Sequence, residues 1–197
     1  QTCALPICHQ IENGSLAGTE FSGTELFSNE KIEKILDYAS EYPKMIVFAK
    51  YTAQIKAIAE ALKGEGYNVR TLTGATEDRD EVIKYANEND CILVAQCSVS
   101  AGWEVPTCPI VIFASMSYSV VDRIQSEGRI HRANHLKKNL FVTLVVKGGI
   151  DEAVYKSIQN KQDFNEMIYL KEHETGSGIP DRISALAEGE PHAHVGI

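Results

Sequence analysis

The strongest constraint on the fold is a repeated alternation between short apolar runs and segments with apolar residues at helical spacing. Short runs bounded by turn residues predict strands, and apolar residues three to four positions apart predict amphipathic helices. Most of the runs are apolar on both faces, which is typical of a parallel sheet covered by helices on both sides. The sequence therefore predicts an open, doubly wound α/β domain with a mostly parallel sheet. The expected strands cover residues 45–49, 68–72, 91–95, 110–114 and 140–146.

The expected helices have recognisable beginnings and ends. A hydroxyl side chain before a helix can accept a hydrogen bond from a first-turn amide, and a glycine can end the helix. Ser28, Thr52 and Thr76 are the candidate starts of three helices. The expected helices cover about residues 30–39, 52 to 64 or 66, 76 onward, 120–130 and 151–161.

The composition indicates one globular domain with an acidic balance. The chain has 197 residues, of which 44% are hydrophobic, and a formal net charge of −8 at pH 7. This length supports one sizeable core. The charge argues against a polybasic surface that holds nucleic acid by counterion release, so any such contact must be local.

Three other classes find little support in the sequence. No apolar run approaches the length of a membrane span, so no membrane partner is expected. The five cysteines are an odd number without paired zinc-ligand spacing, and we expect free thiols in a reducing cytoplasm. His192 and His194 lack a third ligand, so we expect solvated side chains and no metal site.

The two ends of the chain differ in composition from its middle. Residues 1–27 are expected to be an extended lead-in, and residues 1–7 resemble the translation of a sequencing-library adapter. If these residues derive from an adapter, a further domain is expected upstream; the alternative is an ordinary extended N-terminus. Residues 28–170 form the expected domain. Residues 171–197 have little periodicity and are expected to be a weakly structured tail.

The octet at residues 125–132 carries the sharpest chemical signal. On the helix expected over 120–130, Gln125, Arg129 and Arg132 are related by i, i+4 and i+7 and project from one face. Gly128 lets a phosphate or another backbone approach closely. Two planar guanidiniums suit the oxygens of a transferring phosphoryl group. The octet alone fits a solvated basic helix face equally well.

The pattern Gln-x-x-Gly-Arg-x-x-Arg resembles motif VI of the superfamily-two helicases. The resemblance implies a RecA-like domain, the second of the two in such a motor. In that family the arginines reach across a cleft to the γ-phosphate of ATP bound on the first domain. It therefore implies a catalytic role for Arg129 and Arg132 together with Gln125, and a place for Gly128 beside the nucleotide.

The segment at residues 96–106 is similar to motif V of the same family, a hydroxyl-rich loop that ends in Gly-x-Asp. Here Ser98 and Ser100 are the candidate donors to a nucleic-acid phosphate. The resemblance implies that Gly102 permits close approach to the nucleotide and that Glu104, in place of the commoner Asp or Asn, contacts the ribose or orients an arginine. Taken without motif VI, this loop would be a connection between strands with Trp103 as a packing anchor.

Two weaker elements complete the resemblance, which covers roughly residues 44–164. Residues 45–52 resemble motif IV, where Thr52 lies at a helix start that offers free amides to a phosphate. Thr73 and Gly74 match the short Thr-Gly element that contacts the nucleic-acid backbone. Residues 147–154 resemble the helix that follows motif VI in Swi/Snf-like and phage-type translocases.

The sequence lacks a Gly-x-x-x-x-Gly-Lys-Ser/Thr loop and an Asp-Glu-x-His/Asp box. ATP with Mg²⁺ is therefore expected to be held mainly by a missing N-terminal RecA-like domain, and this chain alone is expected to be inactive. The expected partners are that domain and nucleic acid, with DNA favoured over RNA, in a bacterial or phage-type cytoplasm. The alternatives are a non-catalytic RecA-like binding module and a free-standing small-molecule α/β enzyme, for which no nucleophile-base pair is present.

Overall fold

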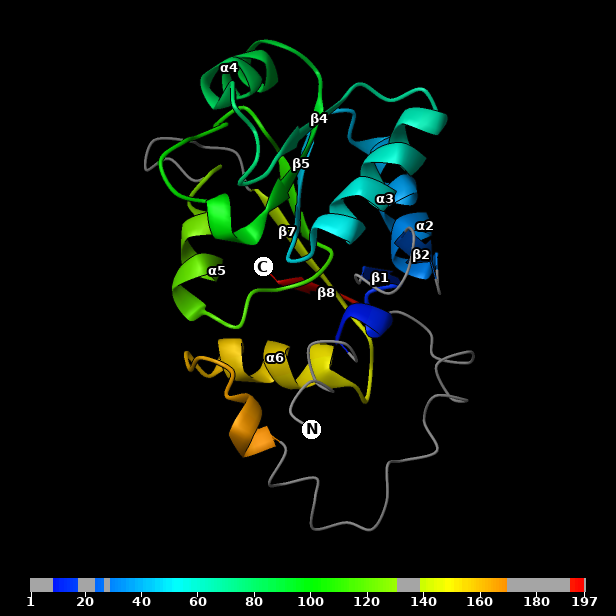
Figure 1. Ribbon diagram of the computed structural model, residues 1–197. Helices are drawn as coiled ribbons and strands as arrows, with labels where there is room; N and C mark the ends of the chain where they lie inside the picture. The colour runs from blue at the N-terminus through cyan, green and yellow to red at the C-terminus, as the bar shows by residue number, and fades with distance from the viewer. Residues whose placement is uncertain (1–8, 18–23, 27–28, 131–138, 170–191, 197) are drawn as a thin grey trace.

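The computed structural model describes residues 9–17, 24–26, 29–130, 139–169 and 192–196. Its centre is a six-stranded sheet in the spatial order β4-β5-β3-β6-β7-β8, and a second sheet pairs β1 with β2 (Figure 1). The strands are β1 (Ser15–Ala17), β2 (Thr24–Leu26), β3 (Met45–Ala49), β4 (Val69–Leu72), β5 (Ile92–Gln96), β6 (Ile110–Phe113), β7 (Leu140–Val145) and β8 (His192–Gly196). The helices are α2 (Glu30–Glu41), α3 (Thr52–Gly64), α4 (Arg79–Glu88), α5 (Val120–Glu127) and α6 (Ile150–Gln159), with a 3-10 turn η1 (Cys97–Val99).

Five neighbouring strands of this sheet, in the order β4-β5-β3-β6-β7, are all parallel, which confirms the predicted fold class. β3 pairs with β5 and β6, β4 pairs with β5, and β6 pairs with β7. All five residues of the central strand β3 are buried. A strand covered on both faces needs apolar side chains in both directions, which is why its sequence is apolar without interruption.

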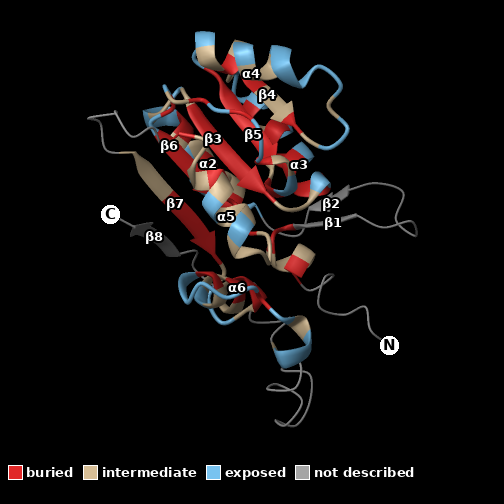
Figure 2. Ribbon diagram, turned by 90° about the vertical axis from the view of Figure 1, so that its left-hand side faces the viewer, coloured by how far each residue is buried: buried red, intermediate tan, exposed pale blue. Residues whose placement is uncertain are grey.

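Two hydrophobic clusters cover the two faces of the sheet. On one face, α2 and α3 pack against Met45, Val47 and Ala49 of β3. On the other, α4, the start of α5 and the helix α6 belong to the cluster that contains Ile46 and Phe48. Figure 2 shows the central strands as buried, with exposed residues on the outer helix surfaces and in loops. The layers are therefore helix, sheet and helix, as the strand pattern predicted.

The connections of neighbouring strands lie on opposite faces. The chain leaves β3 into α3 on one face, whereas it leaves β5 and β6 toward the other face, where Trp103 and Val120 pack. The loops therefore diverge beside the carboxyl end of β3. In open α/β sheets such a divergence is where ligands bind.

Three predicted helix boundaries are wrong. Thr76 does not open a helix, because its hydroxyl accepts from the Thr73 amide in a turn and α4 begins at Arg79. Thr52 is the first residue of α3 and makes no capping hydrogen bond, and the cap position is Tyr51. The helix expected over 120–130 ends at Glu127.

The two ends of the chain hold structure that the sequence did not predict. In the expected extended lead-in, residues 9–12 form a helical turn, and β1 and β2 form an antiparallel pair. In the expected weak tail, β8 pairs antiparallel with β7 at the edge of the sheet. Residues 1–8 and 170–191 lie outside the described residues. Among the helices that the structure describes, none is both long and apolar enough to cross a membrane.

The three cysteines of the described chain are buried and free. Burial raises the pKa of the Cys97 thiol to about 12 and that of Cys108 to about 11. A thiol that is protonated at neutral pH is a poor nucleophile and a poor metal ligand. Within the same residues, no group of three or more histidine, cysteine or acidic side chains comes together around a metal position.

Candidate functional site

The parallel strands bring most of the predicted site residues to one edge of the sheet. Thr52 follows β3, Thr73 and Gly74 follow β4, and the loop at residues 97–104 follows β5. Because parallel strands end at the same side, these three segments share the edge where the loops diverge. The three segments are separated in the sequence by whole strands and helices, and the fold brings them to one edge of the sheet.

The Thr-Gly element and the β5 loop are joined directly. The backbone amide of Gly74 donates to the side-chain oxygen of Gln96, the last residue of β5, at 3.3 Å. The Thr73 hydroxyl accepts from the Ala75 amide at 3.3 Å. Gly74 and Thr52 are exposed, whereas Thr73 is half-buried. The exposed hydroxyl of Thr52 is thus available to a ligand at the edge, whereas the amides of the Thr73–Thr76 turn already donate within the protein.

The two serines of the β5 loop have opposite environments. Ser98 is exposed on η1, but Ser100 is only 1% exposed. Only Ser98 can therefore donate to a phosphate without movement of the loop. Gly102 has a φ of +85°, in the left-handed region that favours glycine, and a side chain there would meet open space. The need for glycine at this position is thus conformational.

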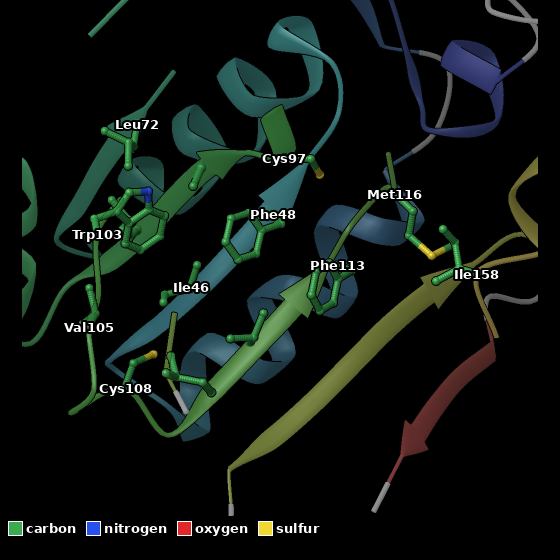
Figure 3. Packing of buried hydrophobic residues seen from close by; sticks show 14 of the residues in the cluster. Ile46, Phe48, Leu72, Cys97, Trp103, Val105, Cys108, Phe113, Met116 and Ile158 are labelled. Atoms are coloured by element: carbon green, nitrogen blue, oxygen red, sulfur yellow. The ribbon is translucent and has the colours of Figure 1, made fainter. Parts of the chain in front are cut away.

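Trp103 anchors the loop, as the alternative interpretation of this segment expected. It is 6% exposed, its indole N–H donates to the Val99 carbonyl at 2.7 Å, and its ring lies 6.1 Å from that of Phe48 (Figure 3). Glu104 is exposed, and its backbone carbonyl accepts from Asn87 at 2.9 Å. The loop is therefore held by its tryptophan while the glutamate side chain lies at the surface.

The helix α5 is tied to the sheet by an arginine outside the octet. The guanidinium of Arg123 lies 3.6 Å from the centre of the Phe113 ring and donates to Thr143 at 3.0 Å. It also pairs with Glu127 one turn along α5, at 2.7 Å. Stacking and hydrogen bonding of this kind fix a planar guanidinium in one orientation. The octet is thus presented by a helix whose position on the sheet is set.

The chain after α5 continues as a tight turn. Gly128 has helical backbone angles, and the amide of Arg129 donates to Ser126 at 3.2 Å, three residues back. A Cβ at Gly128 would lie 3.3 Å from the Gln125 carbonyl oxygen, a tight contact. The absence of a side chain at Gly128 therefore leaves room for the Gln125 carbonyl in this turn.

Arg129 is held by two backbone carbonyls. Its Nε donates to the Gln125 carbonyl at 2.7 Å, and its Nη1 donates to the Trp103 carbonyl. In return, the Val105 amide donates to the Arg129 carbonyl at 2.8 Å. The arginine turn and the β5 loop are thus joined in both directions, a connection that the sequence did not predict.

The structure brings together part of the predicted arginine site. Gln125 and Arg129 are adjacent and half-buried, and Gly128 lies between them. The helix expected to present Gln125, Arg129 and Arg132 ends at Glu127, so Arg129 lies in the turn that follows α5. Arg132 lies outside the described residues.

Lys50 is a site residue that the sequence analysis did not single out. Its ammonium lies 2.9 Å from the centre of the Tyr118 ring, and its backbone amide donates to Ser115 at 2.8 Å. Burial lowers the pKa of Lys50 to about 8. Its position directly after a wholly buried strand was the available signal.

We predict that Lys50 loses its proton near pH 8, and this titration should appear in the side-chain NMR resonance that a Lys50→Arg variant lacks. The unfolded chain keeps this proton to about pH 10.4. Stability should therefore rise with pH between those two values, and the rise should be smaller in Lys50→Met. A Lys50 resonance that titrates only above pH 10 would contradict this environment.

Comparison with known proteins relates the sequence of this chain to helicases. Residues 28–134 match the family described as the helicase conserved C-terminal domain. The pre-mRNA-splicing ATP-dependent RNA helicase prp28 of Schizosaccharomyces pombe is 30% identical over 132 residues, which are 66% of this chain and 19% of that protein. The chromodomain-helicase-DNA-binding protein 1 of Homo sapiens is 20% identical over 154 residues, which are 75% of this chain and 9% of that protein.

Solved structures agree on the fold. The C-terminal part of the Fun30 ATPase domain superposes with a TM-score of 0.63 at 19% identity, covering 74% of this chain and 52% of that one. The C-terminal domain of the DEAD-box protein Dbp5 gives a TM-score of 0.58 at 18% identity, covering 68% of this chain and 78% of that one. Both support the RecA-like fold. The two relatives named above are eukaryotic and lend no support to a bacterial or phage-type origin, and the chain spans less than a fifth of either.

Proposed function

The chain belongs to the helicase conserved C-terminal domain family of the superfamily-two helicases, and we propose that it is the second motor domain of an ATP-dependent nucleic-acid helicase or translocase. In this proposal ATP and Mg²⁺ bind mainly to a first RecA-like domain. Arg129 and Arg132, with Gln125, stabilise charge on the γ-phosphoryl group when the two domains close. The observation that carries the proposal is the two-way link between Arg129 and the β5 loop.

This link supports a coupling of nucleotide to nucleic acid. The partners of the Arg129 guanidinium are neutral carbonyl oxygens, and a phosphate oxygen forms a stronger, charge-assisted hydrogen bond with an arginine. Arg129 would therefore exchange the Trp103 carbonyl for a γ-phosphate oxygen. That exchange removes one anchor of the loop that carries Ser98, so the nucleotide state reaches a nucleic-acid contact through a few bonds.

The nucleotide's other contacts are assigned by position. Among the described residues, no atom lies near the position of a Cβ at Gly102. Glu104 lies in the same β5 loop, and Gly128 lies in the arginine turn that is bonded to this loop. These groups suit the ribose and phosphates of ATP. Mg²⁺ would be held by acidic residues of the first domain and would neutralise charge on the transferring phosphoryl group.

The nucleic-acid groove is proposed from the exposed groups of the same edge. Thr52, Gly74 and Ser98 are exposed there, and Thr73 supports the turn beside them. Ser100 joins them only if the β5 loop opens, because its hydroxyl is now buried. We propose DNA in preference to RNA, and backbone contacts without base specificity, as hydroxyls and amides at phosphates provide.

One observation favours a different function. Arg129 already has a structural role, because it holds the β5 loop through the Trp103 carbonyl. A RecA-like module that has lost catalysis and serves as a binding or regulatory surface would keep such an arginine. Kinetics of the complete two-domain protein separate the two functions.

We predict that Arg129→Lys and Arg132→Lys slow ATP hydrolysis by the two-domain protein by ~10³ to 10⁵-fold while ATP affinity changes little. The lysine keeps the charge but loses the planar fork. Single-turnover hydrolysis and nucleotide binding are the two measurements, and Arg79→Lys, at an exposed arginine of α4, is the control. Near-normal hydrolysis by both variants would favour the non-catalytic module.

The two serines provide a matched pair for the nucleic-acid contact. Ser98→Ala should reduce hydrolysis stimulated by nucleic acid more than basal hydrolysis, because it removes an exposed phosphate donor. Ser100→Ala removes a hydroxyl that is buried and should affect thermal stability more than stimulation. ATP hydrolysis is measured with DNA and with RNA of the same sequence as the stimulating nucleic acid. Equal loss of basal and stimulated rates in Ser98→Ala would assign this serine to the nucleotide instead.

A further inference from the structure

A buried polar cluster lies beside the proposed site but has no part in the proposed chemistry. Its members come from the segment at residues 9–13, which we name the entry segment, and from α2 and α6. His9 and Asp151 are 0% exposed, Asn13 is 4% exposed and Lys31 is 6% exposed. Buried groups of this kind persist only when their hydrogen bonds are satisfied.

Asp151 is the centre of this cluster. Its carboxylate pairs with Lys31 and accepts from His9 Nε2 at 2.8 Å and from Asn13 Nδ2 at 3.2 Å. Burial would raise the pKa of Asp151, but Lys31 and the hydrogen bond from His9 outweigh it and hold the pKa well below its usual value. Two of the three side chains that compensate this buried charge are therefore supplied by the entry segment.

Glu12 makes a second connection, to the start of α6. Its two carboxylate oxygens accept from the amides of Ile150 and Asp151, both at 3.0 Å. A Cβ at Gly149 would collide with this carboxylate, although the backbone there, with φ −109° and ψ −168°, is open to any residue. The absence of a side chain at 149 thus makes room for Glu12.

The entry segment also contacts the loop after β3. His9 Nδ1 lies 2.8 Å from the Tyr51 hydroxyl oxygen, and Tyr51 immediately precedes Thr52. The side-chain amide of Gln54, in the first turn of α3, donates to the Asn13 side chain at 3.3 Å. The same segment therefore touches the start of α6 and the start of α3.

We propose that the entry segment is a latch whose docking on α6 sets the position of the Tyr51–Thr52 loop. The role of this loop as a nucleic-acid contact rests on the proposed function, whereas the contacts of the entry segment do not. The interface is polar, so water can replace its hydrogen bonds when the segment leaves, unlike the apolar contacts of a core. Burial raises the pKa of Glu12 although the α6 amides act in the opposite direction, so docking costs this carboxylate part of its hydration.

Gly149→Ala is the sharpest test, because it removes the room for the Glu12 carboxylate without straining the backbone. In the 197-residue chain, hydrogen exchange should become about tenfold faster at residues 9–13 and at 50–55. Gly64→Ala is the matched control, because a Cβ at position 64 meets nothing within 4 Å. Glu12→Ala should reproduce the effect, and adding Gly149→Ala to it should change little more.

The outcomes separate the possibilities. Faster exchange at residues 9–13 with no change at 50–55 would overturn the coupling and leave a static contact. Additive effects of Glu12→Ala and Gly149→Ala on the unfolding free energy would show that Glu12 and Gly149 act independently, which also overturns the latch. These measurements use neither ATP nor nucleic acid, so their failure is distinct from a failure of the proposed motor function.

Discussion

The parallel register of the buried sheet is the constraint on which the rest of the structure depends. Val47 in the central strand pairs with Val94 on one side and Ile112 on the other, so β3, β5 and β6 are parallel and their carboxyl ends lie side by side. Their loops consequently leave from one edge. Because the sheet is packed on both faces, the elements that carry the loops cannot move independently of the core. The sheet provides a rigid base, and the chemistry lies in loops joined to one another by a few hydrogen bonds.

Those hydrogen bonds connect elements that are distant in sequence. Arg129 bonds to the Trp103 carbonyl across 26 residues, and Glu12 bonds to the Ile150 amide across 138. Each bond joins a segment at the edge of the sheet to another with a different proposed task. In our account the first bond carries the nucleotide state to the β5 loop, and the second holds the entry segment on α6, where it sets the position of the Tyr51–Thr52 loop. Each contact has a second arrangement in our proposals, with Arg129 on a phosphate oxygen and with the entry segment undocked, and two arrangements are what a switch requires.

The sequence predicted the strands well because burial on both faces leaves a plain signal, an uninterrupted apolar run. It also predicted the order of the loops, but it placed Arg129 on a helix, and that helix ends at Glu127. It did not predict that Ser100 is buried, that Arg129 is held by carbonyls, or that Gly149 makes room for Glu12. Those facts depend on which distant segments meet, and no local pattern encodes them. The error at Thr76 has a local cause, since its hydroxyl serves a turn and not a helix.

The central claim is that Arg129 moves from the Trp103 carbonyl to the γ-phosphate when the two motor domains close. Hydrogen exchange of the complete two-domain protein, with and without ADP–aluminium fluoride and Mg²⁺ as a transition-state analogue, tests it most directly. The account predicts slower exchange at residues 125–130 and faster exchange at residues 97–104 when the analogue binds, with the latter slowing again on addition of nucleic acid. Unchanged exchange in both segments, with the analogue demonstrably bound, would contradict it.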